Sequence, residues 1–379
     1  MAWLNEFKRE LQKIGKRKST RAERWATTGL SASYGLQTPS TPAAIKNISS
    51  SGIYLVIHET LSVGQLLKLK IQYDIGPELS SELQISLDAL VARHDEFGAG
   101  LAFVPPPGLD PAVWAVLVRG IAVLDNRDQV VDIFRTLRTV LFLCRLCPSG
   151  AEEAIVLLDG GLDPERTSML FRIAHAVETQ LAADPDFASI RAHPKVVTSV
   201  LRNGSWAPSE LAMQLWIGLF LSSCSTEEPD DSNVILTELL IHLTPFQIAI
   251  YQHACERALA SAPSGNLASV SVVLNPLEIT KLTGITDLGR NAGDLAYLFN
   301  LGLMRKLFDF TSYREVDTFD ITPSELGLAL YRHCLGQRSK LDPRLAAAAR
   351  EHLEIFLPPP IPSAFENFRT HKSESSQEK

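Results

Sequence analysis

The sequence lacks the motifs by which many enzyme families are recognised. It contains no glycine-rich phosphate loop followed by Lys-Ser/Thr, no His-Glu-x-x-His and no Gly-x-Ser-x-Gly. Its histidines are scattered among apolar or charged neighbours, as surface and core histidines usually are. We therefore expect no catalytic residues, and we expect that the protein is not an enzyme.

Cysteines are few, and long apolar runs are absent. The five cysteines are odd in number and lack the spacing of a disulfide framework. Cys144 and Cys147 form one close pair, but no second pair or histidines follow at zinc-ligand spacing. Because this pair ends an apolar helical run, we interpret both as buried, inert thiols rather than as a redox or metal site. With no membrane-spanning run and no signal peptide, we expect a soluble protein.

Positive charge is also scarce. The 36 lysines and arginines stand against 43 aspartates and glutamates, for a net charge of −7. This balance argues against generalised nucleic-acid binding, which would need a local basic patch. The hydrophobic content of 45% and charged content of 21% are those of a globular chain that buries real cores. A length of 379 residues predicts two or three domains.

The first residues are the most basic part of the chain. Residues 2–14 place apolar side chains at helical spacing, with basic side chains elsewhere on the wheel, which predicts an amphipathic basic helix over residues 1–15. We favour packing of this helix on its own domain, and the alternative is an anionic membrane surface. The basic cluster continues to Arg24, so an anionic ligand would be drawn here.

Two short motifs carry the functional hypothesis. Arg17 and Arg21 lie four residues apart, and Asn47, Ser49 and Gly52 form an Asn-x-Ser-x-x-Gly pattern between two strand-like runs. A guanidinium bonds a phosphate or a guanine edge bidentately and stacks on a base. At the start of a turn, Asn47 and Ser49 would donate to and accept from a base edge, while Gly52 would permit the backbone angles of the turn.

In this order and strand context, the two motifs resemble the PilZ domain, the bacterial receptor module for cyclic di-GMP. The likeness covers roughly residues 16–105, including the strand-like run at 98–104. It implies a six-stranded antiparallel barrel over residues 16–108 with cyclic di-GMP as its ligand and no other cofactor or metal. Because cyclic di-GMP is made inside bacteria, it also implies a cytoplasmic location. The binding residues that the resemblance implies are Arg17, Arg21, Asn47, Ser49 and Gly52.

The region of the resemblance reads as strands separated by turn residues. Short runs of this kind build a small barrel. The six strand-like runs are 25–36, 42–48, 52–58, 65–73, 83–94 and 98–104.

From residue 109 the pattern becomes helical. Asp110 and Pro111 begin a helix through Trp114, as an N-cap and a first-turn proline do. Residues 109–242 form the predicted helical region, in which the section from 193 onward to 255 loosely resembles the helical region of the abortive-infection alpha family, a likeness that implies no catalytic residues. Further helices are predicted over 127–146, over 165–183 behind the N-cap Asp163, over 209–220, and from His242.

Residues 243–340 have the element order of a winged helix-turn-helix domain of bacterial repressors, which they resemble. The candidate recognition helix, residues 287–300, carries one base and two acids. Phosphate neutralisation supplies most non-specific DNA affinity, so we favour a protein-interaction role and disfavour DNA binding. The predicted elements are a helix from Thr244, a short helix at 276–284, the helix at 287–300, strand-like runs at 303–310 and 314–321, and a helix opened by 322–325.

The expected fold class is therefore multidomain α+β: an N-terminal six-stranded antiparallel PilZ-like β-barrel, then a mostly α-helical region that ends in a winged-helix-like domain. The polar, proline-rich tail at 358–379 should be disordered. We favour a cyclic di-GMP receptor whose helical half contacts a protein partner. The alternatives are a cyclic di-GMP-responsive transcriptional regulator that binds DNA, and a scaffold whose barrel binds no ligand.

Overall fold

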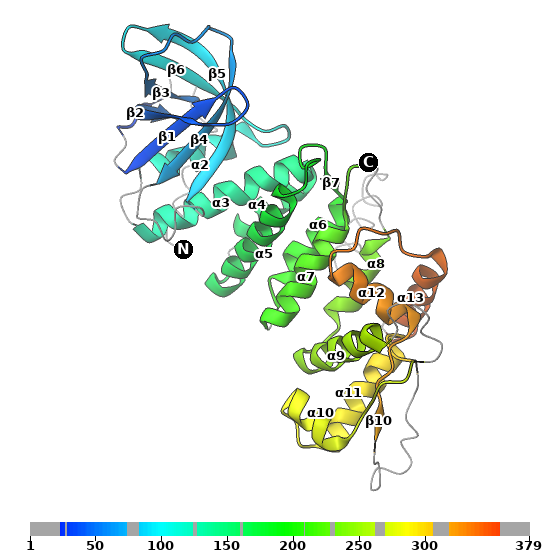
Figure 1. The fold of residues 1–379 in the computed structure, drawn as a ribbon. Helices are drawn as coiled ribbons and strands as arrows, with labels where there is room; N and C mark the ends of the chain where they lie inside the picture. The colour runs from blue at the N-terminus through cyan, green and yellow to red at the C-terminus, as the bar shows by residue number, and fades with distance from the viewer. Residues whose placement is uncertain are drawn as a thin grey trace, which may run out of the picture. The chain divides into compact units, whose positions relative to one another are not determined.

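A computed structural model of the chain describes most of the residues between 23 and 356 (Figure 1). The predicted helix at 2–14, Arg17, Arg21 and the tail at 358–379 lie outside the described residues. The chain divides into two compact units, Met1–Ala207 with Ser223–Pro229, and Pro208–Ser222 with Asp230–Lys379. The described ranges are 23–26, 29–73, 83–123, 127–159, 162–207, 209–227, 232–261, 270–305 and 318–356.

Six strands of the first unit close into a barrel in the order β1-β2-β3-β6-β5-β4, with every neighbouring pair antiparallel. This confirms the predicted six-stranded antiparallel barrel and the mixed α+β class. The strands are β1 Leu30–Gly35, β2 Thr41–Ser49, β3 Gly52–Val56, β4 Leu66–Tyr73, β5 Gln84–Asp95 and β6 Gly98–Val104.

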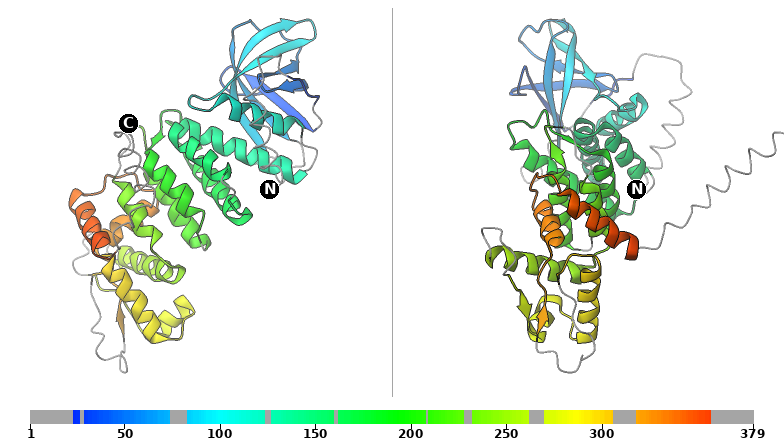
Figure 2. Two further views of the ribbon diagram at one scale, coloured as in Figure 1. Left: turned by 180° about the vertical axis from the view of Figure 1, so that it is seen from behind. Right: turned by 90° about the vertical axis from the view of Figure 1, so that its right-hand side faces the viewer.

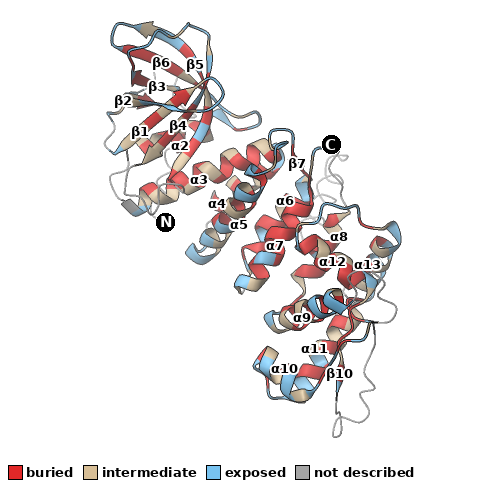
Figure 3. Ribbon diagram, in the orientation of Figure 1, coloured by how far each residue is buried: buried red, intermediate tan, exposed pale blue. Residues whose placement is uncertain are grey.

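Alternate side chains of the strands fill the barrel, as Figure 3 shows by the alternation of buried and more exposed positions. Leu69 of β4 pairs with Leu87 of β5, and both are buried. Leu55 of β3 and Leu101 of β6 are buried in the same way. Because a slip of one residue would turn this apolar set outward, the core fixes which side chains of each strand face outside.

The start predicted for the first strand, at residue 25 of the range 25–36, was wrong. Only Leu30–Gly35 forms a strand, and it follows Gly29, whose φ of +76° is left-handed and interrupts an extended chain. Trp25 instead makes a single antiparallel bridge with Ile48 of β2.

Two helices, α2 (Pro111–Val123) and α3 (Arg127–Leu146), contact the barrel. Figure 2 shows both near one end of it. The α2 helix begins as predicted, with the Asp110 carboxylate accepting from the Ala112 amide at 2.6 Å. The rings of Phe103 and Trp114 meet edge to face, 5.7 Å between centroids, and those of Tyr73 and Phe134 lie 6.3 Å apart. Aromatic contacts therefore fix both helices to the barrel.

The rest of the first unit is helical. The predicted helices at 127–146 and 165–183 are confirmed as α3 and α5, and Asp163 caps α5 by accepting from the Arg166 amide at 2.9 Å. The α4 helix was not predicted, because Pro148-Ser-Gly reads as a break although proline is tolerated in a first turn. The elements are α4 Pro148–Asp159, α5 Pro164–Ala182, β7 Arg191–Ala192, α6 Pro194–Ser199, a π-helix Val200–Gly204 and β8 Cys224–Ser225.

The second unit consists of helices and one short sheet. The predicted helix at 209–220 is confirmed as α7, and the helix predicted from Thr244 is confirmed as α9, which begins at Pro245 with Thr244 as its cap. The earlier start predicted at His242 was wrong. His242 instead ends α8. The elements are α7 Glu210–Ser222, α8 Asn233–Ile241, α9 Pro245–Ser261, β9 Val273–Leu274, α10 Pro276–Thr283, α11 Leu288–Asn300, β10 Phe319–Asp320, α12 Glu325–Cys334 and α13 Pro343–Phe356.

Candidate functional site

The β2–β3 hairpin holds three of the five predicted ligand residues. Its turn is Ser50 and Ser51, between the paired residues Ser49 and Gly52. Asn47 lies inside β2, opposite Tyr54 of β3, and not at the start of the turn as predicted. The predicted strands were separated correctly, but β2 continues to Ser49 because a two-residue turn suffices to reverse the chain.

Gly52 has a different role from the one predicted. Its φ is not positive, and neither turn residue has a positive φ, so the turn does not depend on glycine for its backbone angles. A Cβ at Gly52 would instead lie 2.1 Å from the carbonyl oxygen of Leu101. Glycine is therefore required because β6 approaches the backbone of β3 too closely for a side chain.

The Ser49 hydroxyl is used within the hairpin. It donates to the carbonyl oxygen of Gly52 at 3.1 Å and lies 3.3 Å from the Ser51 hydroxyl oxygen. The residue is only 8% exposed. Its remaining lone pair could still accept from a ligand, but its donor stabilises the turn.

The turn is also fixed from outside the hairpin. The Trp114 indole Nε1 donates to the Ser50 carbonyl oxygen at 3.1 Å, and the Phe103 amide donates to the Ser51 carbonyl oxygen at 3.0 Å. Both turn carbonyls thus have partners, one of them on helix α2. A movement of the turn would therefore change the hydrogen bond to Trp114 of α2.

Cross-strand pairing places Asn47 at one end of a row over four strands. Asn47 pairs with Tyr54, Tyr54 with Gly100, and Gly100 with Arg93. The neighbouring Leu55 and Leu101 point into the barrel core, so the side chains of the row point to the outer face of the sheet, where Tyr54 is only 5% exposed. We refer to Asn47, Tyr54, Gly100 and Arg93 as the outer row.

Cations gather around the centre of the outer row. The Lys46 Nζ lies 5.3 Å and the Arg93 Cζ 5.4 Å from the centroid of the Tyr54 ring. A Cβ at Gly100 would lie 2.9 Å from the Arg93 Cγ and Nε, so the glycine leaves room for the arginine side chain across β6. The face that carries Asn47 therefore contains two cations around an aromatic ring.

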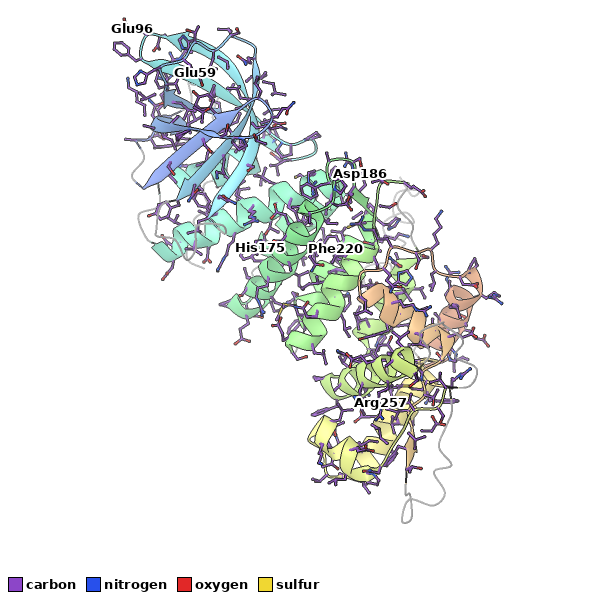
Figure 4. The ribbon with its side chains drawn as sticks, in the orientation of Figure 1. Glu59, Glu96, His175, Asp186, Phe220 and Arg257 are labelled. Atoms are coloured by element: carbon purple, nitrogen blue, oxygen red, sulfur yellow. The ribbon has the colours of Figure 1, made fainter. Side chains whose placement is uncertain are left out.

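The Tyr54 hydroxyl donates to the carboxylate of Asp95. This hydrogen bond raises the pKa of Tyr54 and lowers that of Asp95, so the pair stays a neutral phenol and a carboxylate near neutral pH. A second pair of this kind joins Tyr34 to Glu59, which Figure 4 labels in the barrel. Both hydroxyls hold loops or strand ends of the barrel in place.

The bridge between Trp25 and Ile48 brings the preceding segment to β2. The Trp25 amide donates to the Ile48 carbonyl oxygen at 2.9 Å, and the Ile48 amide donates to the Trp25 carbonyl oxygen at 3.0 Å. Ile48 lies between Asn47 and Ser49 in the chain. Arg17 and Arg21, the other two predicted ligand residues, lie outside the described residues.

Sequence reasoning missed Lys46, Tyr54, Arg93 and Gly100. A signal was present, because a two-residue turn between Ser49 and Gly52 sets Asn47 opposite Tyr54. The partners on β5 and β6 could not be found in this way, since a bulge shifts the register between Val91 and Arg93.

The cysteines are buried and form no disulfide within the described residues. This confirms the expected burial of Cys144 and Cys147. Burial raises the pKa of the Cys144 thiol to about 11, which disfavours the reactive thiolate. Over the part of the chain that the structure describes, no three metal-ligating side chains cluster, and no helix has the length and apolar character to cross a bilayer.

No protein-family model matches the chain, and no curated protein matches it. The likeness to PilZ stays a prediction from the sequence motifs.

Proposed function

We propose that this protein is a cyclic di-GMP receptor of the PilZ kind, with the ligand on the outer face of β2, β3 and β6. The observation that carries the proposal is the outer row, which sets Asn47 beside cations and next to the Trp25–Ile48 bridge. The proposal assigns the protein no catalytic residue, metal or resident cofactor.

The chemistry of this face suits the ligand. Cyclic di-GMP carries two phosphates and two guanines, whose O6 and N7 atoms accept hydrogen bonds. The amide of Asn47 supplies donors and an acceptor for a base edge, and the cations Lys46 and Arg93 lie within reach of the same strand pair.

Chain connectivity supports a place for Arg21, the second arginine of the sequence motif, near the same face. Arg21 precedes Trp25 by four residues, and four residues of chain span at most about 14 Å. Since Trp25 pairs with Ile48, this limit supports a role for Arg21 at the face that carries Asn47 and Ser49.

The proposed output runs through helix α2. Ligand contact at the hairpin would alter the turn, and the Ser50 carbonyl oxygen is bonded to Trp114 of α2. The α2 helix packs on α3, and α3 packs on α4 and α5. A shift of α2 would thus reach the helices of the first unit, where we propose that occupancy is read out by a protein partner.

For residues 243–340 we propose a winged-helix-like module that contacts protein rather than DNA. The order α9, β9, α10, α11, β10, α12, with β9 paired to β10, supports the winged-helix likeness. On α11, Asp287 caps the helix and Asp294 accepts from the Gln247 side chain at 2.9 Å, while Arg290 lies over the Phe246 ring. The candidate recognition helix therefore carries two acidic residues, which would repel DNA phosphates, and its one basic residue, Arg290, contacts a ring of the same protein. Residues 306–317, which include most of the predicted strand-like runs at 303–310 and 314–321, lie outside the described residues.

Calorimetric titration of the full chain with cyclic di-GMP tests the proposal. We expect a dissociation constant in the micromolar range or below, about −8 kcal/mol. Asn47→Ala should weaken binding, because a paired base edge loses its partners. Gln252→Ala on α9 is the matched control, because it removes a side-chain amide from the second unit. The affinity of this variant for cyclic di-GMP should be unchanged. Absence of heat and of competition at about 100 µM ligand would overturn the receptor proposal.

A further inference from the structure

The first unit contains a pocket of about 240 Å³ between α3 and α5. Its lining residues recur at helical spacing on each helix, so one stripe of α3 faces one stripe of α5. His175, labelled on α5 in Figure 4, is one of them. The pocket contains no residue of the outer row.

The lining of this pocket is net positive. Arg135 and Arg138 of α3 and Arg172 of α5 supply three guanidiniums, and Glu178 is the one carboxylate among the lining residues. The Arg138 Nε lies 2.6 Å from the Glu178 Oε2, so the carboxylate neutralises one guanidinium and holds it in place. Asp132 lies one turn earlier on α3, outside the lining, where burial raises the pKa of its carboxyl.

The same pocket has apolar walls and hydroxyl groups. Phe142 and Phe171 contribute aromatic rings from the two helices, and both residues are largely buried. Thr139 and Ser168 add hydroxyls, which donate to anionic oxygens as well as accept. Guanidiniums recognise phosphate or carboxylate groups, and the rings favour an aromatic body.

We propose that this pocket binds a small aromatic molecule that carries a phosphate or carboxylate group. The anionic group would contact Arg135 and Arg172, and the ring would lie against Phe142 and Phe171. Ligand pockets commonly measure about 300–1,000 Å³, so this one takes a small ligand, and a cyclic dinucleotide exceeds it. The site is therefore separate from the proposed cyclic di-GMP site and does not depend on it.

The test uses the full-length protein and phenyl phosphate as the probe, followed by ligand-observed NMR. We expect saturable binding with a dissociation constant of about 1 mM or tighter. Benzoate tests the carboxylate source, inorganic phosphate tests the anion alone, and benzyl alcohol tests the neutral ring. Inorganic phosphate and benzyl alcohol should each bind about tenfold more weakly than phenyl phosphate. Saturating cyclic di-GMP should not displace the probe.

Two variants decide whether the pocket is the site. Arg172→Gln removes an exposed guanidinium and Ser168→Glu adds an opposing charge at an exposed position, so both should fold. Each should weaken phenyl phosphate binding about tenfold or more. Arg257→Gln, an equally exposed position on α9, is the control and should not change it. Absence of binding, equal binding of benzyl alcohol, or unchanged affinity in both pocket variants would overturn the proposal.

Discussion

Replacing Gly52 by alanine distinguishes two explanations of the glycine in the hairpin motif. If Gly52 served only backbone angles that alanine also adopts, Gly52→Ala would stabilise the protein by about 0.4–1 kcal/mol, because alanine restricts the unfolded chain. The structure predicts the opposite sign. The added Cβ would lie 2.1 Å from the Leu101 carbonyl oxygen, where real Cβ atoms stay beyond 3.0 Å. Strands β3 and β6 would have to separate, which we expect to cost about 2–3 kcal/mol.

Native-state hydrogen exchange of the full chain measures this cost where it arises. Amides of β3 and β6 should exchange roughly 30- to 150-fold faster in Gly52→Ala, as the expected free energy implies. Gly100→Ala is the matched control on β6, because its Cβ would meet the Arg93 side chain, which can move, and should cost less than about 1 kcal/mol. Unchanged or slower exchange in Gly52→Ala would refute the close-approach explanation.

Three further predictions follow from the same account. Arg21→Ala should weaken cyclic di-GMP binding by about 1.5–3 kcal/mol in calorimetry and leave the melting temperature unchanged; full affinity or a collapsed melting curve would contradict the assigned role. The isolated segment 243–337 should not bind duplex DNA at physiological salt, and micromolar binding with a steep salt slope would overturn that expectation. Because burial raises the pKa of Cys144 to about 11, iodoacetamide at pH 8 should label this cysteine only after unfolding, and rapid labelling of the native protein would show a reactive thiol.

The strands and helix starts were predictable because they rest on local signals. Alternating apolar residues gave the strands of the barrel, and Asp110 and Asp163 cap helices α2 and α5 as their positions before a proline indicated. The role of Gly52 was not predictable, since it depends on Leu101 of β6, which is distant in the chain. To predict which residues of distant strands pair, one must know the register of the whole barrel, and local sequence patterns do not give that register.

The candidate site was predictable in part for the same reason. Asn47, Ser49 and Gly52 could be chosen from their spacing alone, and the structure places them on one hairpin. Arg93 joins them through two strand pairings and a β-bulge, and the hydrogen bond from Trp114 to the Ser50 carbonyl oxygen crosses from helix to barrel. Within the described residues, helices α2 and α3 both contact the barrel, and the predicted helix at 2–14 lies outside them.

Hydrogen exchange with and without cyclic di-GMP tests the central claim most directly. The account predicts that ligand protects residues 15–24 and the β2–β3 hairpin, because a segment that closes over a ligand loses its freedom to open. It also predicts changed protection in α2 around Trp114, since that side chain holds the turn. Protection confined to the barrel would contradict the relay to the helices, and no protection at a saturating concentration of ligand would contradict the receptor itself.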